Sequence, residues 1–216
     1  MRRFTCLLIS AFLLSGCATA KITAYRNPEF ATRQFTALVV FAHGMAPRYG
    51  IEFERQMCKE LAPTPCNPGT SVLPPTIQAK FYTADEVAKY LQDSGADAIL
   101  VVVRVDDQSE TQYFGTISDL SSSASATASG SLNFYKNVAL WGGADDSVLR
   151  ALESKSGYQG VAYGQLGLFD RQSGNIAWLG KTMVGGRSID STTPEAFMYA
   201  TTSKIARELK AAGFVK

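Results

Sequence analysis

One histidine and two pairs of adjacent aspartates are the residues of this 216-residue chain best suited to acid–base chemistry. A general base at His43 would need an orienting carboxylate and a nucleophile, and neither a G-x-S-x-G elbow nor a papain-like cysteine signature supplies them. Asp106-Asp107 and Asp145-Asp146 could provide the two carboxylates of a glycoside hydrolase. Because adjacent residues of an extended segment point to opposite sides, a working pair would combine one residue from each site. We therefore expect loop residues here and predict no catalytic residue.

The thiols offer a different chemistry, because the N-terminus has the pattern of an export signal. Arg2 and Arg3 precede an apolar run over residues 4–14, and the small residues Ser15 and Gly16 follow it. A charged start, a short apolar run and a small-residue cleavage site are typical of secretory signal peptides. The run is too short to cross about 30 Å of hydrocarbon as a helix, which takes about 20 residues.

The residues Leu14-Ser15-Gly16-Cys17 resemble the lipobox of bacterial lipoproteins. The resemblance implies cleavage before Cys17, attachment of a diacylglyceryl group to its thiol, and acylation of the new amine. Ala18, in place of the aspartate that retains such proteins at the inner membrane, implies an outer-membrane lipoprotein facing the periplasm. We expect a signal peptide over residues 1–16, a polar, lipid-anchored tether over 17–34 and a folded domain over 35–216. The alternative is an ordinary signal peptide cut near Ala18 or Ala20.

Cys6 leaves with the signal and Cys17 takes the lipid, so Cys58 and Cys66 remain as an even pair in an oxidising compartment. Two prolines in the seven residues between them turn the chain back, and we predict a disulfide. Two reduced thiols are the alternative. The spacing excludes a C-x-x-C redox pair, and a metal site would lack further cysteine or histidine ligands, so we predict no metal and no cofactor.

The composition is that of a globular domain, with 46% hydrophobic and 19% charged residues and a net charge of +2. Without Arg2 and Arg3 the number of basic residues falls from 21 to 19, which equals the number of acidic residues. Nucleic-acid binding needs a concentrated basic surface, which the sequence lacks, so we expect no nucleic-acid partner.

Alternating strand and helix patterns predict the elements that would position these residues, in a single mixed-sheet α/β domain. The order is β-α-β-α-β, a long Ser-rich insertion, then β-β-α. The strands are expected at 35–42, at 71–79 as an edge strand or extended segment, at 98–105, and at 160–169 and 176–184 around a hairpin turn. The low-complexity part of the insertion covers 121–131. Tyr49, Phe53, Met57 and Leu61 form the apolar stripe of the first helix, with Glu52, Glu54 and Lys59 off it.

Capping signals set the ends of the other two helices. Thr83 and Glu86 form a capping box, and Gly95 ends that helix. The last helix begins after Thr193 with Pro194 in its first turn. It ends at Gly213, where Leu209 and Phe214 are spaced for the apolar contact of a Schellman motif.

The chain resembles a group of envelope lipoproteins over roughly residues 35–216, on the segments 37–41, 82–87, 95–101 and 169–178 and the helix that ends at Leu61. The group includes the curli-secretion channel lipoprotein and the penicillin-binding-protein activator lipoproteins. It shares a small α/β domain related to the N-terminal domain of the Tol translocation protein. The resemblance implies a non-enzymatic accessory protein that binds an envelope protein or assembles with copies of itself. The alternative is a periplasmic enzyme acting on cell-wall glycan or a small substrate through His43 and acidic loop residues.

Overall fold

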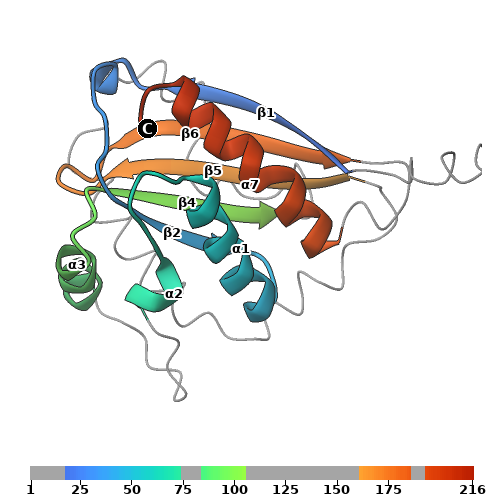
Figure 1. The fold of residues 1–216 in the computed structure, drawn as a ribbon, viewed down its shortest axis with the longest axis horizontal. Helices are drawn as coiled ribbons and strands as arrows, with labels where there is room; N and C mark the ends of the chain where they lie inside the picture. The colour runs from blue at the N-terminus through green and yellow to red at the C-terminus, as the bar shows by residue number, and fades with distance from the viewer. Residues whose placement is uncertain (1–17, 74–83, 106–160, 186–192) are drawn as a thin grey trace, which may run out of the picture.

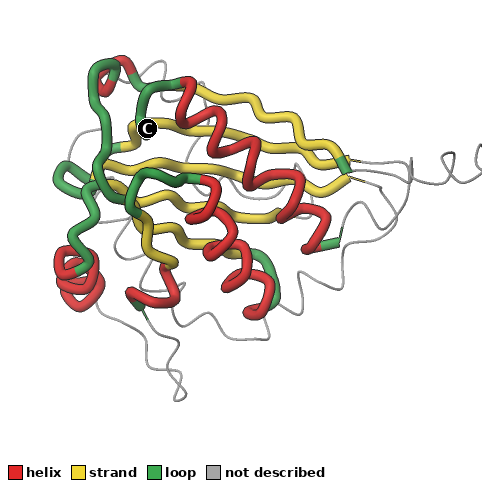
Figure 2. The backbone as a smooth tube through the Cα atoms, viewed as in Figure 1, coloured by secondary structure: helices red, strands yellow, loops and turns green. Residues whose placement is uncertain are grey.

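A computed structural model describes residues 18–73, 84–105, 161–185 and 193–216. These residues form one six-stranded mixed sheet with helices packed against it, which confirms the predicted single α/β domain. Figure 2 shows long helices crossing one face of the sheet. Within the described residues, none of the helices combines the length and the apolar character that a membrane span requires.

The strands follow the spatial order β1-β6-β5-β4-β2-β3. Their bounds are β1 Thr19–Arg26, β2 Leu38–His43, β3 Cys66–Pro68, β4 Ala98–Val105, β5 Val161–Asp170 and β6 Ile176–Gly185. Strands β2, β3 and β4 are parallel to one another, and β4, β5, β6 and β1 pair antiparallel. The predicted strands at 98–105, 160–169 and 176–184 are therefore confirmed to within a residue.

Helices α1 (Pro47–Glu60) and α7 (Pro194–Ala211) cover one face of the sheet (Figure 1). The main core lies beneath them, where Phe53, Met57 and Leu61 of the predicted stripe are fully buried. On the other face, α2 (Gly69–Val72) and α3 (Ala84–Asp93) belong to a second cluster with Phe41. The near-continuous apolar runs of β2 and β4 follow from this arrangement, because strands covered on both faces bury every side chain.

Two predicted segments are wrong. Residues 17–34 are not a tether throughout, because Thr19–Arg26 is strand β1 and Pro28–Phe30 is the short helix η2. Of the edge strand or extended segment predicted at 71–79, residues 71 and 72 belong to α2 instead and residues 74–79 lie outside the described residues, while an edge strand lies earlier, at Cys66–Pro68. Both strands lie at edges of the sheet, where half-polar or very short segments suffice because only one side is paired.

The capping signals are largely confirmed. Thr193 Oγ1 accepts a hydrogen bond from the Ala196 amide at 3.2 Å at the start of α7. At its end, the Phe214 amide donates to the Leu209 carbonyl at 3.0 Å, and Gly213 has the positive φ of a Schellman motif. The capping residue Thr83, the insertion at 121–131, the four aspartates singled out above and Cys17 lie outside the described residues.

Candidate functional site

His43 is the last residue of β2 rather than the first residue of a loop, and it pairs with Val103 of β4. Its side chain shares a face of the sheet with Val39 and Phe41, because side chains alternate along a strand. Burial lowers the pKa of the imidazole to about 4. The ring is therefore uncharged at neutral pH and holds no proton that it could readily donate there.

Glu54 is a buried carboxylate that the sequence pattern places outside the apolar stripe of α1. One carboxylate oxygen accepts the Ala42 amide at 3.2 Å, and the other accepts the Thr70 amide and hydroxyl, each at 2.8 Å. Burial raises the pKa of this carboxyl, and the hydrogen bonds from Thr70 and Ala42 oppose that shift. Glu54 thereby ties α1 to the end of β2 and to α2, which gives it a positioning role in the fold.

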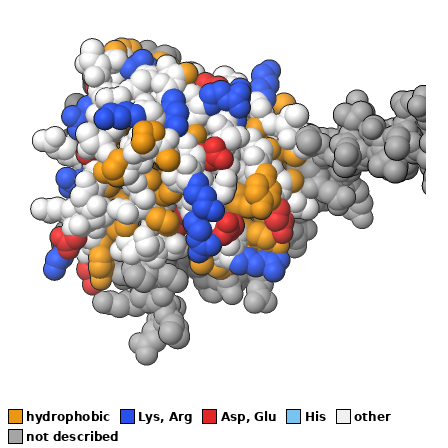
Figure 3. Space-filling model, in the orientation of Figure 1, with side chains coloured by type: hydrophobic (Ala, Val, Ile, Leu, Met, Phe, Trp, Pro, Cys, Tyr) orange, Lys and Arg blue, Asp and Glu red, His pale blue; other side chains and the backbone are white. Residues whose placement is uncertain are grey.

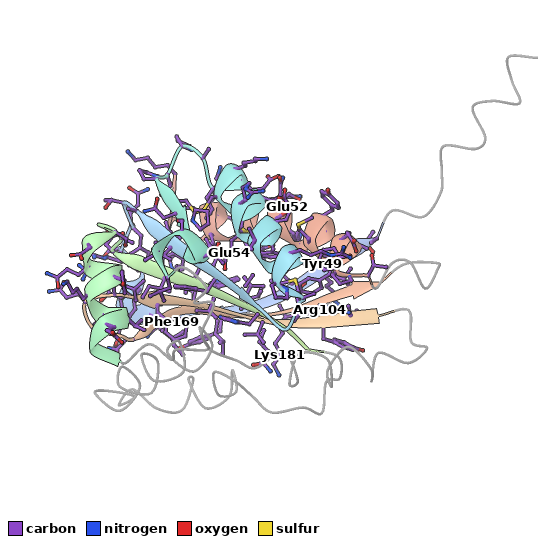
Figure 4. The ribbon with its side chains drawn as sticks, turned by 90° about the horizontal axis from the view of Figure 1, so that it is seen from below. Tyr49, Glu52, Glu54, Arg104, Phe169 and Lys181 are labelled. Atoms are coloured by element: carbon purple, nitrogen blue, oxygen red, sulfur yellow. A yellow bond between two sulfur atoms is a disulfide. The ribbon has the colours of Figure 1, made fainter. Side chains whose placement is uncertain are left out.

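His43 and Glu54 do not form an acid–base pair, although both have shifted pKa values. Glu54 belongs to α1, which covers the same face of the sheet as α7, whereas the His43 side chain lies on the other face of β2. Figure 4 shows Tyr49, Glu52 and Glu54 on the α1 side and Lys181 on the opposite side of the sheet. In the part of the chain that the structure describes, no three His, Cys, Asp or Glu side chains gather as a metal site would require.

Tyr49 and Glu195 connect the first turns of α1 and α7. A hydrogen bond between the phenol and the carboxylate raises the pKa of Tyr49 and lowers that of Glu195. The Arg48 guanidinium lies 4.3 Å from the centre of the Tyr49 ring and also donates to its hydroxyl. This polar cluster fixes the start of one helix against the start of the other.

Cys58, in the last turn of α1, forms a disulfide with Cys66, the first residue of β3. The structure thus confirms the predicted pairing. Their Cα atoms are 5.2 Å apart, within the usual range for disulfides. The bond fastens the end of α1 to the edge strand β3, which pairs with β2 over only three residues.

The register places the start of β1 at one end of the sheet, which we call the Thr19 end. Thr19 pairs with Gly185, which in turn pairs with Val161. Ala18 is the first described residue, so the predicted lipidation site Cys17 is separated from the sheet by that one residue. The opposite end, which we call the hairpin end, carries the turn between β5 and β6 at residues 171–175.

At the hairpin end, Asp97 accepts hydrogen bonds from the backbone of the segment that leads into β2. Its carboxylate oxygens accept the Thr36 and Ala37 amides and the Thr36 hydroxyl, all at 3.0 Å. Asp170 similarly accepts the Ser173 amide and hydroxyl at 2.7 Å inside the hairpin turn. Sequence reasoning missed Asp97, although an aspartate just before a buried strand was the available signal.

No family model and no curated protein matches this chain. Two of the solved structures that are similar to it are PelC dodecamers. One is the PelC dodecamer from Paraburkholderia phytofirmans, with 12% identity and a TM-score of 0.44 over 92% of this chain and 100% of that chain. The other is a substituted PelC dodecamer from the same organism, with 12% identity and a TM-score of 0.42 over 91% of this chain and 99% of that chain.

Proposed function

We propose that this protein is a non-catalytic lipoprotein of the bacterial outer membrane that faces the periplasm and binds an envelope protein. Residues 1–16 direct export and are removed, and the thiol and amine of Cys17 carry the lipid chains. Several chains are needed for lasting attachment, since each buried CH₂ contributes about 0.8 kcal/mol and one chain alone holds reversibly.

The observation that carries the proposal is that β1 begins at Thr19, two residues after Cys17 in the sequence. Cleavage before Cys17 leaves all eight residues of β1, Thr19–Arg26, in the mature protein. Cleavage after Ala20 would remove two residues of that strand, which pair with Gly185 and Val184 of β6. The lipobox cleavage site and a site after Ala18 are therefore both compatible with the complete sheet, whereas the site after Ala20 is not.

Among the described residues, the separation of His43 from Glu54 favours a binding role over catalysis, while the four aspartates of the enzymatic alternative lie outside them. His43 and Glu54 lie on opposite faces of β2, and the low pKa of His43 leaves it a weak base at neutral pH. On the face covered by α1 and α7, basic, acidic and hydrophobic side chains are interspersed (Figure 3). Such a mixed surface suits a protein partner better than a polyanion.

Fractionation of the bacterial envelope tests the anchor. The wild-type protein should be processed and should float with the outer membrane, and C17S should accumulate unprocessed or leave that fraction. The proposal fails if C17S is processed and fractionates as the wild type does.

Crosslinking in intact envelopes followed by affinity purification tests the binding role. The matched control is an unrelated periplasmic domain that carries residues 1–18 of this chain. A protein crosslinked above the level of this anchored control supports the proposal, and its absence counts against an envelope partner. Light scattering of the detergent-solubilised protein shows whether the partner is a second copy of the chain.

The variant H43A tests the enzymatic alternative in the same cells. A binding protein should keep its crosslinks and complement a deletion strain when His43 is replaced. Loss of complementation with unchanged crosslinks and unchanged protein level would instead support catalysis through His43.

A further inference from the structure

We infer that the domain stands upright on the lipid headgroups, with the Thr19 end of the sheet on the membrane and the hairpin end directed away from it. This orientation rests on the proposed lipidation of Cys17 and adds the surface through which the domain meets the membrane. The occupant of that surface is the headgroup layer in which the acyl chains are inserted.

The length of chain between the lipid and the sheet allows little freedom. Consecutive Cα atoms are 3.8 Å apart, so the Cα atom of Cys17 lies within about 8 Å of that of Thr19. Thr19 is already paired with Gly185. A tether of the predicted length over residues 17–34 would have allowed any orientation, whereas one intervening residue holds this end of the sheet at the membrane.

The sheet is long enough for its two ends to differ clearly in height. Strands β5 and β6 each contain ten residues. At about 3.3 Å per residue, the hairpin turn lies about 30 Å from Val161 and Gly185. An upright domain therefore keeps residues 171–175 far from the headgroups.

Two of the three large exposed hydrophobic side chains lie towards the Thr19 end and support this orientation. Three large hydrophobic side chains are exposed among the described residues, namely Tyr199 at 66%, Tyr90 at 42% and Met183 at 40%. Met183 lies two residues from Gly185, at the end of β6. Tyr199 lies in the second turn of α7, at the level of Phe197, which packs over Gly164 near the start of β5. Tyr90 lies in α3, which precedes the start of β4 at the hairpin end. Tyrosine favours the membrane–water interface, where its ring and its hydroxyl are both accommodated.

The face of the sheet covered by α1 and α7 is less suited to contact with the membrane. It carries the exposed ion pair Arg55–Glu52 on α1 and the partly exposed ion pair Lys204–Glu208 on α7. Burying such pairs against lipid would cost desolvation of both charges. Figure 1 shows α7 starting on the side of the fold where β1 starts and ending near the C-terminus. In the upright orientation the two ends of this helix therefore lie at different distances from the membrane.

Single-cysteine labelling of the full lipoprotein tests the orientation. In the mature protein Cys17 is blocked by lipid and Cys58 is bonded to Cys66, so an introduced cysteine is the free thiol. Y199C, A211C and Q172C replace exposed residues on α7 and in the hairpin turn. Each labelled protein is reconstituted in vesicles of phosphatidylethanolamine and phosphatidylglycerol that contain a lipid with a nitroxide headgroup, and quenching of the fluorophore is measured.

The upright orientation requires quenching of the Y199C label to exceed that of the A211C and Q172C labels at least about twofold, because positions 199 and 211 are about 18 Å apart along α7. Equal quenching of Y199C and A211C would mean that the helix face lies on the membrane. Stronger quenching of Q172C, or weak quenching of all three labels on vesicle-bound protein, would also overturn the inference. Protein that fails to float with the vesicles would instead refute lipidation, and with it the proposed function.

Discussion

At the hairpin end of the sheet aspartate side chains accept hydrogen bonds from backbone amides, whereas exposed tyrosine and methionine side chains lie towards the Thr19 end. Asp97 and Asp170 accept backbone amides at the hairpin end, and the disulfide joins α1 to β3 there. Tyr199 and Met183 are exposed towards the other end. The comparison suggests that one end of the domain stabilises the fold and the other end meets the membrane. Substitutions at the two ends should therefore differ in what they change.

Removing the disulfide should have the largest effect on stability. The double variant C58A/C66A should lose about 2–3 kcal/mol of unfolding free energy, because the bond closes a short loop. Chemical denaturation of the oxidised wild type and the variant measures the difference. An unchanged midpoint would show that the hairpin end does not depend on this bond.

The variant D97A should lose about 2 kcal/mol of unfolding free energy, because the substitution removes a carboxylate that accepts backbone amides and leaves those amides without that acceptor. The control is D93A, since Asp93 is exposed near the end of α3. Thermal unfolding at neutral pH separates the two variants. Equal effects would contradict the role assigned to Asp97.

His43 should make the fold sensitive to mild acid. Its pKa of about 4 in the fold lies below the ordinary value of 6.5. The stability that the neutral ring contributes is therefore complete above pH 6.5 and is lost as the pH falls towards 4, with about 2 kcal/mol lost between pH 7 and pH 5. The raised pKa of Glu54 has the opposite effect on the pH dependence of stability. The stability that its protonated carboxyl contributes is lost as the pH rises through that pKa.

Unfolding curves of the wild type and H43A across this pH range isolate the histidine. The difference in stability between the two proteins should change with pH, whatever the cost of the substitution at pH 7. Parallel pH profiles would mean that His43 titrates normally in the folded protein.

The variant Y199S should have the smallest effect on stability, within about 0.5 kcal/mol, because the side chain is exposed. Its effect should appear instead as weaker contact of the Thr19 end with vesicles. Comparison with Y90S, at an exposed tyrosine on α3, shows whether the effect is specific to that end. A large loss of stability in Y199S alone would break the proposed division between the two ends.

Local signals in the sequence predicted much of this fold. The cap at Thr193, the Schellman end at Gly213 and the hairpin between β5 and β6 depend on residues close together in the chain. For the same reason the pairing of Cys58 with Cys66, eight residues apart, was accessible from the sequence.

The elements that were missed depend on distant partners. Strand β1 contains lysine, threonine and arginine, and it is defined by pairing with β6 more than 150 residues away. Strand β3 has three residues and includes Pro68, so no alternation could identify it. Glu54 looks exposed on a helical wheel, but Thr70 and Ala42 supply the donors that allow its burial.

The mass of the N-terminal peptide of the mature protein, purified from membranes, tests the central proposal most directly. We expect a peptide that begins at Cys17 and carries a diacylglyceryl group on the thiol and an acyl chain on the amine. The same peptide from C17S should be absent. An unmodified peptide that begins at Ala18 or later would contradict the lipid anchor and the orientation that depends on it.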